Sequence, residues 1–366
     1  MREGYGPTFS MVLRRGEQRV EITCGPITDD VLASHRRGHG GLIVDARVAE
    51  LYPEVVERFR SQLFDEAAET LVLPRGEAAK DVELLPTLWT RMGAGGFQRS
   101  SMLVVLGGGA TLDVGAFLGA TWQRGIDVLL VPTTLLAQVD AGLGGKCGVN
   151  MGDVKNQVGA IYQPKALLVD PAFLASLEYD EWLSGLGEVL KTALLAGGTL
   201  WTELCLFDGA ARKKLEDPAV SRLVRACLKY KANLVEQDER ERGVRTLLNL
   251  GHTVGHVLEA LSLRHGAAVV PHGCAVAAGI LAEARAFGAP SSVVAAIKDR
   301  MVALGLPTEI SLPFDREEVL QLLLADKKRA GRGISVPFLR EMGDADLRVE
   351  SPESLVDAVR LAIEAP

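Results

Sequence analysis

Residues 102–113, MLVVLGGGATLD, combine a short apolar run with three consecutive glycines and the start of a helical pattern. A strand that ends in glycines and enters a helix allows backbone N–H groups to approach a pyrophosphate. The spacing differs from the G-x-G-x-x-G dinucleotide fingerprint, and a purely structural turn explains this stretch equally well. The stretch therefore predicts a strand–turn–helix unit whose function depends on its surroundings.

Further apolar runs of similar length lie in the first half of the chain, at Leu42–Asp45, Thr70–Leu73, Val128–Val131 and Ala166–Val169. Amphipathic stretches separate several of them, as at Ala49–Phe64 and Asp81–Met92. Continuous apolar strands that alternate with helices are typical of a parallel sheet covered on both faces. We therefore expect an α/β domain with a parallel sheet over residues 1–180.

The second half of the chain has a helical period nearly throughout. The main amphipathic stretches are Glu181–Leu195, Asp217–Glu236, Val254–Leu263, Gly273–Phe287 and Ser291–Leu304. Ser351, followed by Glu353 and Ser354, is typical of the cap of a final helix. These patterns predict an all-α domain over residues 181–366.

Composition narrows the class of protein. The chain has 366 residues, of which 48% are hydrophobic and 24% charged, with a net charge of −7. Its length favours two domains, and no basic stripe points to nucleic acid or to a membrane surface. No apolar run approaches the roughly 20 residues of a membrane span. The five cysteines lack paired spacing, which is typical of a reducing cytoplasm.

Polar residues follow several of the predicted strands. Asp45 ends the first strand, where an acidic residue can bind a ribose hydroxyl. Glu77 and Lys80 follow the second strand, and Thr133 and Thr134 follow the fourth. Helix capping is the alternative explanation for the two acidic residues. Because ligands gather at the carboxyl ends of strands in open α/β sheets, we favour nucleotide binding.

A polar pattern at helical spacing marks the second half: Glu241, Arg245, Asn249, His252 and His256. If this stretch is helical, these side chains share one face, which would be poor core and is better explained by a cleft. His272 begins another helical stretch, and Glu188 and Lys191 lie one turn apart in a third. Two histidines and a carboxylate suit a catalytic divalent metal such as zinc, although the spacing is dispersed.

Several cationic and amide side chains are candidates for binding an anion: Arg124, Lys146, Lys155, Asn156, Lys231, and Lys327 or Lys328. The two glycines before Lys146 expose its ammonium group and backbone donors. Asp140, beside the same glycine loop, is suited to a water or a substrate hydroxyl. For each lysine taken alone, plain surface is the alternative.

Taken together, these segments resemble the dehydroquinate synthases, which belong to the sugar phosphate cyclases. The segments that carry the resemblance are VPTTLLAQVD at 131–140, GGK at 144–146, KN at 155–156 with YQP at 162–164, GEVLK at 187–191, LNLGHTVGH at 248–256, HG at 272–273 and DKK at 326–328. They run in the order of the family.

The resemblance implies an N-terminal NAD-binding α/β domain, a helical C-terminal domain, bound NAD, zinc or cobalt, and a homodimer. It implies the metal ligands Glu188, His252 and His272. It implies NAD contacts at Asp45, Glu77, Lys80, Gly109 to Asp113, Thr133, Thr134, Asp140, Lys146, Lys155, and Phe173 to Ser176. The implied substrate pocket comprises Asp140, Lys146, Asn156, Lys191, Lys231, Glu241, Arg245, Asn249, His256, Lys327 or Lys328, and Arg124 reaching into the neighbouring subunit's site.

The implied activity converts 3-deoxy-arabino-heptulosonate 7-phosphate into 3-dehydroquinate and phosphate, in the shikimate pathway to the aromatic amino acids. In the family, NAD oxidises a hydroxyl, phosphate leaves by β-elimination, and NADH reduces the ketone before an aldol step closes the ring. The net redox change is zero.

The chain departs from the family pattern at Leu112, Cys147, Cys274 and residues 151–154. These departures leave room for a modified substrate. One alternative is another sugar phosphate cyclase, for which altered carboxylate-binding residues would be expected. A second is a metal-dependent polyol or glycerol phosphate dehydrogenase, which would consume NAD. A third is a non-catalytic NAD-binding regulator, which would leave the polar set unexplained.

Overall fold

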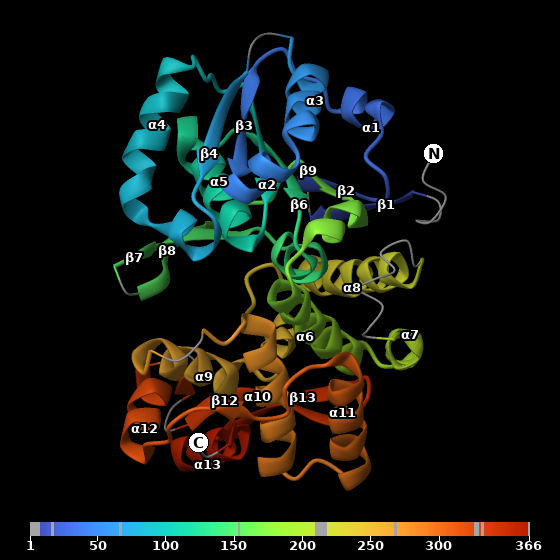
Figure 1. The fold of residues 1–366 in the computed structure, drawn as a ribbon, viewed down its shortest axis with the longest axis vertical. Coiled ribbons are helices and arrows are strands. Elements are labelled where there is room, and N and C mark those ends of the chain that lie inside the picture. The colour runs from blue at the N-terminus through green and yellow to red at the C-terminus, as the bar shows by residue number, and fades with distance from the viewer. Residues whose placement is uncertain are drawn as a thin grey trace. The chain divides into compact units, whose positions relative to one another are not determined.

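The computed structural model describes residues 8–15, 18–65, 68–152, 154–208, 218–266, 269–325, 329–330 and 333–364. The chain divides into two compact units (Figure 1). The first comprises Met1–Leu177 with Leu215–Arg240, and the second Glu178–Lys214 with Glu241–Pro366. The predicted division between residues 180 and 181 lies close to the end of the first segment at Leu177, but it would assign residues 218–240 to the C-terminal domain, whereas their contacts group them with the first unit.

The first unit contains the strands and helices β1 (Phe9–Arg15), β2 (Gln18–Cys24), α1 (Asp29–Ser34), β3 (Gly40–Asp45), α2 (Ala46–Leu51), α3 (Pro53–Leu63), β4 (Glu69–Leu73), α4 (Leu85–Ala94), β5 (Met102–Gly107), α5 (Gly109–Thr121), β6 (Asp127–Pro132), β7 (Lys146–Met151), β8 (Val154–Ile161), β9 (Ala166–Val169) and α8 (Pro218–Gln237). Short helical turns join them: η2 (Gly76–Lys80), η3 (Val82–Leu84), η4 (Trp122–Arg124), η5 (Ala137–Ala141) and η6 (Pro171–Ser176).

A seven-stranded sheet in the order β1-β2-β9-β6-β5-β3-β4 forms the centre of this unit. The five predicted strands are confirmed, and they pair in parallel. The hairpin β1–β2 extends the sheet, and β2 pairs in parallel with β9. The sequence did not lead us to predict this hairpin, although buried Val20, Ile22 and Cys24 alternate along β2 as expected of a strand with one covered face.

Both faces of the sheet are covered, as predicted (Figure 1). On one face, Leu42, Val44 and Val104 pack against residues of α1 to α3 such as Phe59. On the other face α5 packs closely, with Gly115 against the side chain of Val105. This double coverage explains why the strands are apolar without alternation.

The second unit is mainly helical, as predicted. Its elements are α6 (Tyr179–Ala196), α7 (Gly198–Leu206), η8 (Val244–Asn249), α9 (His252–Arg264), α10 (His272–Ala286), α11 (Ser291–Leu304), β10 (Ile310–Ser311), α12 (Arg316–Ala325), β11 (Arg329–Ala330), β12 (Gly333–Glu341), β13 (Asp344–Glu350), α13 (Pro352–Ala362) and β14 (Ile363–Glu364). Ser351 caps α13 through its hydroxyl, as expected.

The strands of the second unit correct the prediction of an entirely α-helical domain. β12 and β13 form an antiparallel ribbon that β11 extends, and β10 pairs with β14. Ile334, Val336 and Phe338 alternate along β12 and enter the same core as α9, α10 and α13. Their period of two residues is that of a strand with one buried face.

No helix among the described residues is long and apolar enough to cross a membrane.

Candidate metal and nucleotide sites

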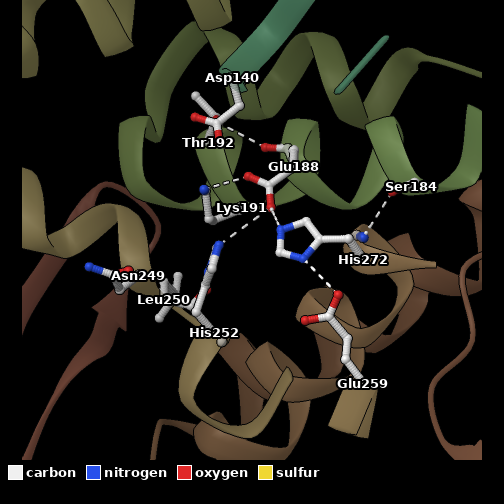
Figure 2. A network of polar contacts seen from close by, with 12 residues as sticks. Asp140, Ser184, Glu188, Lys191, Thr192, Asn249, Leu250, His252, Glu259 and His272 are labelled. Carbon is white, nitrogen blue, oxygen red and sulfur yellow. Dashed lines mark hydrogen bonds and ion pairs between the residues drawn. The ribbon is translucent and has the colours of Figure 1, made fainter. Parts of the chain in front are cut away.

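Three helices of the second unit bring Glu188, His252 and His272 together. Glu188 lies in α6, while His252 and His272 are the first residues of α9 and α10. One ligand atom from each side chain lies within 4.8 Å of the other two. The structure therefore places the three predicted metal ligands in one cluster (Figure 2).

Each of these side chains adjoins a glycine at which two backbones meet. A Cβ on Gly187 would lie only 2.0 Å from the carbonyl oxygen of Gly273, which no real side chain tolerates. Because Gly187 precedes Glu188 and Gly273 follows His272, the crossing of α6 and α10 brings this carboxylate to this imidazole. The third ligand, His252, follows Gly251.

Gly251 also shows that the condition for one shared face, a continuous helix from Glu241 to His256, is not met. Its φ of 76° is in the left-handed region, and it separates the 3-10 turn η8 from α9. A Cβ there would lie 2.5 Å from the carbonyl oxygen of Val276 on α10. The predicted common face is therefore divided between η8, which carries Arg245 and Asn249, and α9.

Hydrogen bonds orient the two imidazoles. The Nδ1 atom of His252 lies 3.2 Å from the carbonyl oxygen of Leu250, and that of His272 lies 3.1 Å from Oε1 of Glu259. Because a carbonyl or carboxylate oxygen accepts, each Nδ1 donates a proton. Both Nε2 atoms then face Oε1 of Glu188, at 3.7 Å from His252 and 3.4 Å from His272 (Figure 2).

The centre of the cluster is buried and charged, while His272 is partly exposed. The side chain of Glu188 has no exposed surface, and its other carboxylate oxygen pairs with the ammonium group of Lys191, which is also buried. Burial by itself would lower the pKa of His272, but the contacts with Glu188 and Glu259 raise it to about 10. One carboxylate oxygen and the two imidazole Nε2 atoms that face it form a donor set suited to a divalent cation such as zinc.

Of the other predicted residues of the second unit, Arg245 and Asn249 lie in η8, Glu241 precedes it, and His256 lies beside the metal cluster. Arg245 is 2% exposed, and the side-chain amide of Asn249 donates to Oε1 of Glu241. His256 is exposed, and its ring centroid lies 5.5 Å from that of His252. Lys327 and Lys328 lie outside the described residues.

In the first unit, the glycine turn forms the predicted strand–turn–helix. β5 ends at Gly107, and α5 begins at Gly109. The first N–H groups of a helix have no acceptor within it, so this terminus is suited to a phosphate. Leu112, which departs from the family pattern, is buried rather than exposed at the turn.

The carboxylate of Asp45 caps a helix and also contacts the first turn of α5. Its Oδ1 accepts from the backbone N–H of Arg47 at 2.8 Å and so caps α2. Its Oδ2 accepts at 3.4 Å from the hydroxyl of Thr111, in the first turn of α5. The capping alternative therefore describes one carboxylate oxygen, while the other lies at the glycine turn.

A chain of polar contacts links four predicted residues through one that was not predicted. The buried ammonium group of Lys80 donates to Asp113 at 2.7 Å and also to Asn156. The N–H of Asn156 donates to Oδ1 of Asn150 at 2.8 Å, and the amide of Asn150 donates to Glu77 at 2.7 Å. Burial raises the pKa of Asp113, while the charge of Lys80 opposes that shift.

Asp140 and Lys231 form a second polar pair of the first unit. The ammonium group of Lys231 donates to the carboxylate of Asp140 and, at 2.7 Å, to its carbonyl oxygen. Asp140 lies in η5, a π-helical turn, and such turns are frequent at functional sites. Lys146 and Lys155 are exposed on β7 and β8.

The remaining predicted nucleotide contacts have structural partners. Thr133 is buried, and the hydroxyl of Thr134 accepts from the backbone N–H of Ala137 at 3.2 Å. Two residues of η6 contact Tyr52, whose ring packs edge-on against Phe173 and whose hydroxyl donates to Ser176 at 2.8 Å. These contacts hold the segments at the strand ends in place. The binding of a nucleotide by these residues stays a prediction.

Unusual backbone conformations coincide with predicted site residues. Among the described residues, the non-glycine positions with positive φ are Gln123, Arg124, Asn156 and Glu241. Three of these four are predicted substrate-pocket residues. Such conformations carry a cost of order 1–3 kcal/mol each and cluster at functional sites.

Sequence reasoning missed three residues that support these clusters: Asn150, Glu259 and Glu283. Glu283 of α10 is 2% exposed and accepts from the backbone N–H groups of Gly251 at 3.0 Å and Val254 at 3.2 Å. It therefore caps the N-terminus of α9, the helix that begins at His252. The sequence carried a signal for Glu283, because an acidic residue within an apolar helix requires a buried partner.

Two family models match the chain. The 3-dehydroquinate synthase N-terminal model matches residues 70–184, and the 3-dehydroquinate synthase C-terminal model matches residues 185–329. Among curated relatives, the 3-dehydroquinate synthase of Shewanella loihica is 36% identical over 337 residues, which span 90% of this chain and 92% of that protein.

Two solved structures have a similar fold over almost the whole length of this chain. The structure of 2-deoxy-scyllo-inosose synthase complexed with carbaglucose-6-phosphate, NAD+ and Co2+ has a TM-score of 0.82 and 22% identity, covering 97% of this chain and 100% of that one. ValA (2-epi-5-epi-valiolone synthase) from Streptomyces hygroscopicus subsp. jinggangensis, with NAD+ and Zn2+ bound, has a TM-score of 0.83 and 24% identity, covering 96% and 98%. At these identities the likeness concerns the fold.

Proposed function

Because this chain belongs to the 3-dehydroquinate synthase family, we propose that it converts 3-deoxy-arabino-heptulosonate 7-phosphate into 3-dehydroquinate and phosphate. The observation that carries the proposal is the convergence of Glu188, His252 and His272, with both Nε2 atoms turned toward one buried carboxylate. This activity would place the enzyme in the shikimate pathway, and the unpaired spacing of its cysteines supports the cytoplasm as its compartment.

The proposed cofactors are NAD and a divalent cation, zinc or cobalt. When bound, they supply hydride transfer and polarisation of a substrate oxygen. Glu188, His252 and His272 would hold the cation. The N-terminus of α5, with Asp45 and the Lys80–Asp113 pair, would hold NAD.

The remaining polar residues would bind the substrate. Arg245 is proposed for the carboxylate, because a planar guanidinium matches it in geometry. Lys191, Lys231 and Asp140 are proposed for the hydroxyl groups. The proposed phosphate ligands are Lys146, Asn156, Asn249, His256, Lys327 or Lys328, and Arg124.

We further propose that the protein is a homodimer in which Arg124 completes the partner's site. Gln123 and Arg124 have φ angles of 51° and 67°, and Gly125 follows with 122°. The hydroxyl of Tyr162 donates to the carbonyl oxygen of Ile126 at 2.8 Å, which holds the segment after this turn. A strained turn that presents an exposed arginine is difficult to explain as plain surface.

The test is phosphate release from the heptulosonate phosphate with catalytic NAD and Zn2+, followed by identification of the product. We expect one phosphate and one 3-dehydroquinate per substrate, with no proportional increase in NADH absorbance. Accumulation of NADH in proportion to product would identify a polyol or glycerol phosphate dehydrogenase instead. A different carbocycle from another sugar phosphate would identify another cyclase, which the retained Arg245 and Asn249 argue against.

A further inference from the structure

The two histidines of the metal cluster are held by acceptors of different charge. His252 donates from Nδ1 to a backbone carbonyl, that of Leu250. His272 donates from Nδ1 to a carboxylate, that of Glu259, at 3.1 Å. Glu259 lies in α9, and His272 begins α10, so this contact joins two helices (Figure 2).

The position of Glu259 matches a known requirement of metal-binding histidines. A histidine that binds a metal through Nε2 must carry its remaining proton on Nδ1, and an acceptor at Nδ1 fixes both this tautomer and the plane of the ring. A carboxylate also increases the basicity of the ring, which strengthens its bond to a cation. Glu259 has the geometry for both effects.

We propose that Glu259 is a positioning residue that fixes His272 in the metal-binding tautomer and strengthens the binding of the divalent cation. The proposal rests on the proposed function, because it takes Glu188, His252 and His272 as the metal ligands. Glu259 itself lies on the far side of the His272 ring from Glu188, since its contact is with Nδ1 and that of Glu188 is with Nε2.

A purely structural role for Glu259 is less well supported. Its side chain is 20% exposed, so its charge could be solvated without His272. The packing of α9 on α10 has other causes, because Gly255 lies against Ala275 and Gly279 against the backbone of Gly251. Loss of Glu259 is therefore expected to affect His272 more than the contact between the two helices.

The experiment measures the dissociation constant for Zn2+ by competition with a chromophoric chelator. We compare the wild type with Glu259→Ala, Glu259→Gln, His272→Ala and Glu318→Gln. The last is a matched control, because Glu318 contacts the Nε2 atom of His265 at 2.9 Å in the same unit but has no contact with the metal cluster. The visible spectrum of bound Co2+ reports the ligand geometry, and thermal unfolding of the metal-free variants reports the fold.

We expect Glu259→Ala to weaken Zn2+ binding about 10- to 100-fold and to alter the Co2+ spectrum. Glu259→Gln should recover part of the affinity, because an amide oxygen still accepts from Nδ1. A dissociation constant of Glu259→Ala within about twofold of the wild type, or an equal loss in Glu318→Gln, would overturn the assignment of Glu259 alone. Failure of the wild type to bind one Zn2+, or of His272→Ala to lose it, would overturn the proposed metal site and this inference with it.

Discussion

Replacement of Glu283 by alanine is expected to release the N-terminus of α9 and, with it, His252 of the metal cluster. Glu283 accepts two backbone hydrogen bonds, from Gly251 and Val254, in a buried setting. Hydrogen bonds to a charged group contribute about 1.5–3 kcal/mol each. The two bonds together predict a loss of about 3–6 kcal/mol in the free energy of local opening at the start of α9.

Hydrogen exchange followed by mass spectrometry measures this loss directly, in peptides that cover residues 250–256. A change of 3 kcal/mol corresponds to exchange that is faster by more than about 100-fold, because each 1.4 kcal/mol is a factor of ten. Glu283→Gln keeps one acceptor oxygen and should lie between the alanine variant and the wild type. Zn2+ binding should weaken in the same order, because His252 is the first residue of α9.

Glu317→Ala is the control, since Glu317 is an exposed residue of α12. Exchange in residues 250–256 that is as slow in Glu283→Ala as in this control would refute the reasoning. It would mean that the contacts of Gly251 with α10 hold the start of α9 without the carboxylate. Faster exchange across the whole second unit, without a larger effect at residues 250–256, would likewise contradict a local cap.

Three further predictions concern the cofactor, the subunits and the thiols. Chelation of the divalent cation should abolish activity, and a variant that lacks Glu188 and His252 should retain no stoichiometric Zn2+. Arg124→Ala should lower kcat/KM about 10- to 100-fold through a lost phosphate contact, with NAD and Zn2+ still bound, and mixing it with Lys191→Ala should restore activity in hybrid dimers. At pH 8 the native protein should react with a thiol reagent chiefly at the exposed Cys205, because burial raises the pKa of thiols such as Cys274 to about 12.

Each of these predictions has a contradicting outcome. Stoichiometric Zn2+ in the double variant would place the metal elsewhere. Mixed dimers that stay inactive, after subunit exchange has been demonstrated, would argue against a site shared between subunits. Rapid reaction of more than one thiol at pH 8, before any unfolding, would show that the buried cysteines are accessible in the native protein.

The sequence predicted the parts of the fold that depend on local patterns. The strands β3 to β6 and β9 are continuous apolar runs, and the three predicted metal ligands lie in the segments that carried the resemblance to the family. The break at Gly251 was not predictable, because it depends on the approach of α10 to that residue. The grouping of α8 with the first unit has the same kind of cause, since an amphipathic pattern does not specify which core it will cover.

Glu259 and Glu283 illustrate the same limit at the level of single side chains. Each contacts a residue of another helix, and the spacing along its own helix gives no indication of that partner. In contrast, Glu188 and Lys191 lie one turn apart in α6, so their pairing follows from helical geometry alone.

The glycine contacts beside the three ligands have a consequence for the lifetime of the protein in the cell. A cation held by Glu188, His252 and His272 would cross-link α6 to α9 and α10, which follow much later in the chain, and these helices meet where no side chain separates their backbones. A ligand that binds only the folded state stabilises it by about 2.7 kcal/mol at a hundredfold excess over its dissociation constant. Metal starvation would therefore expose the second unit to proteolysis, and the supply of the cation would control the abundance of the enzyme as well as its turnover.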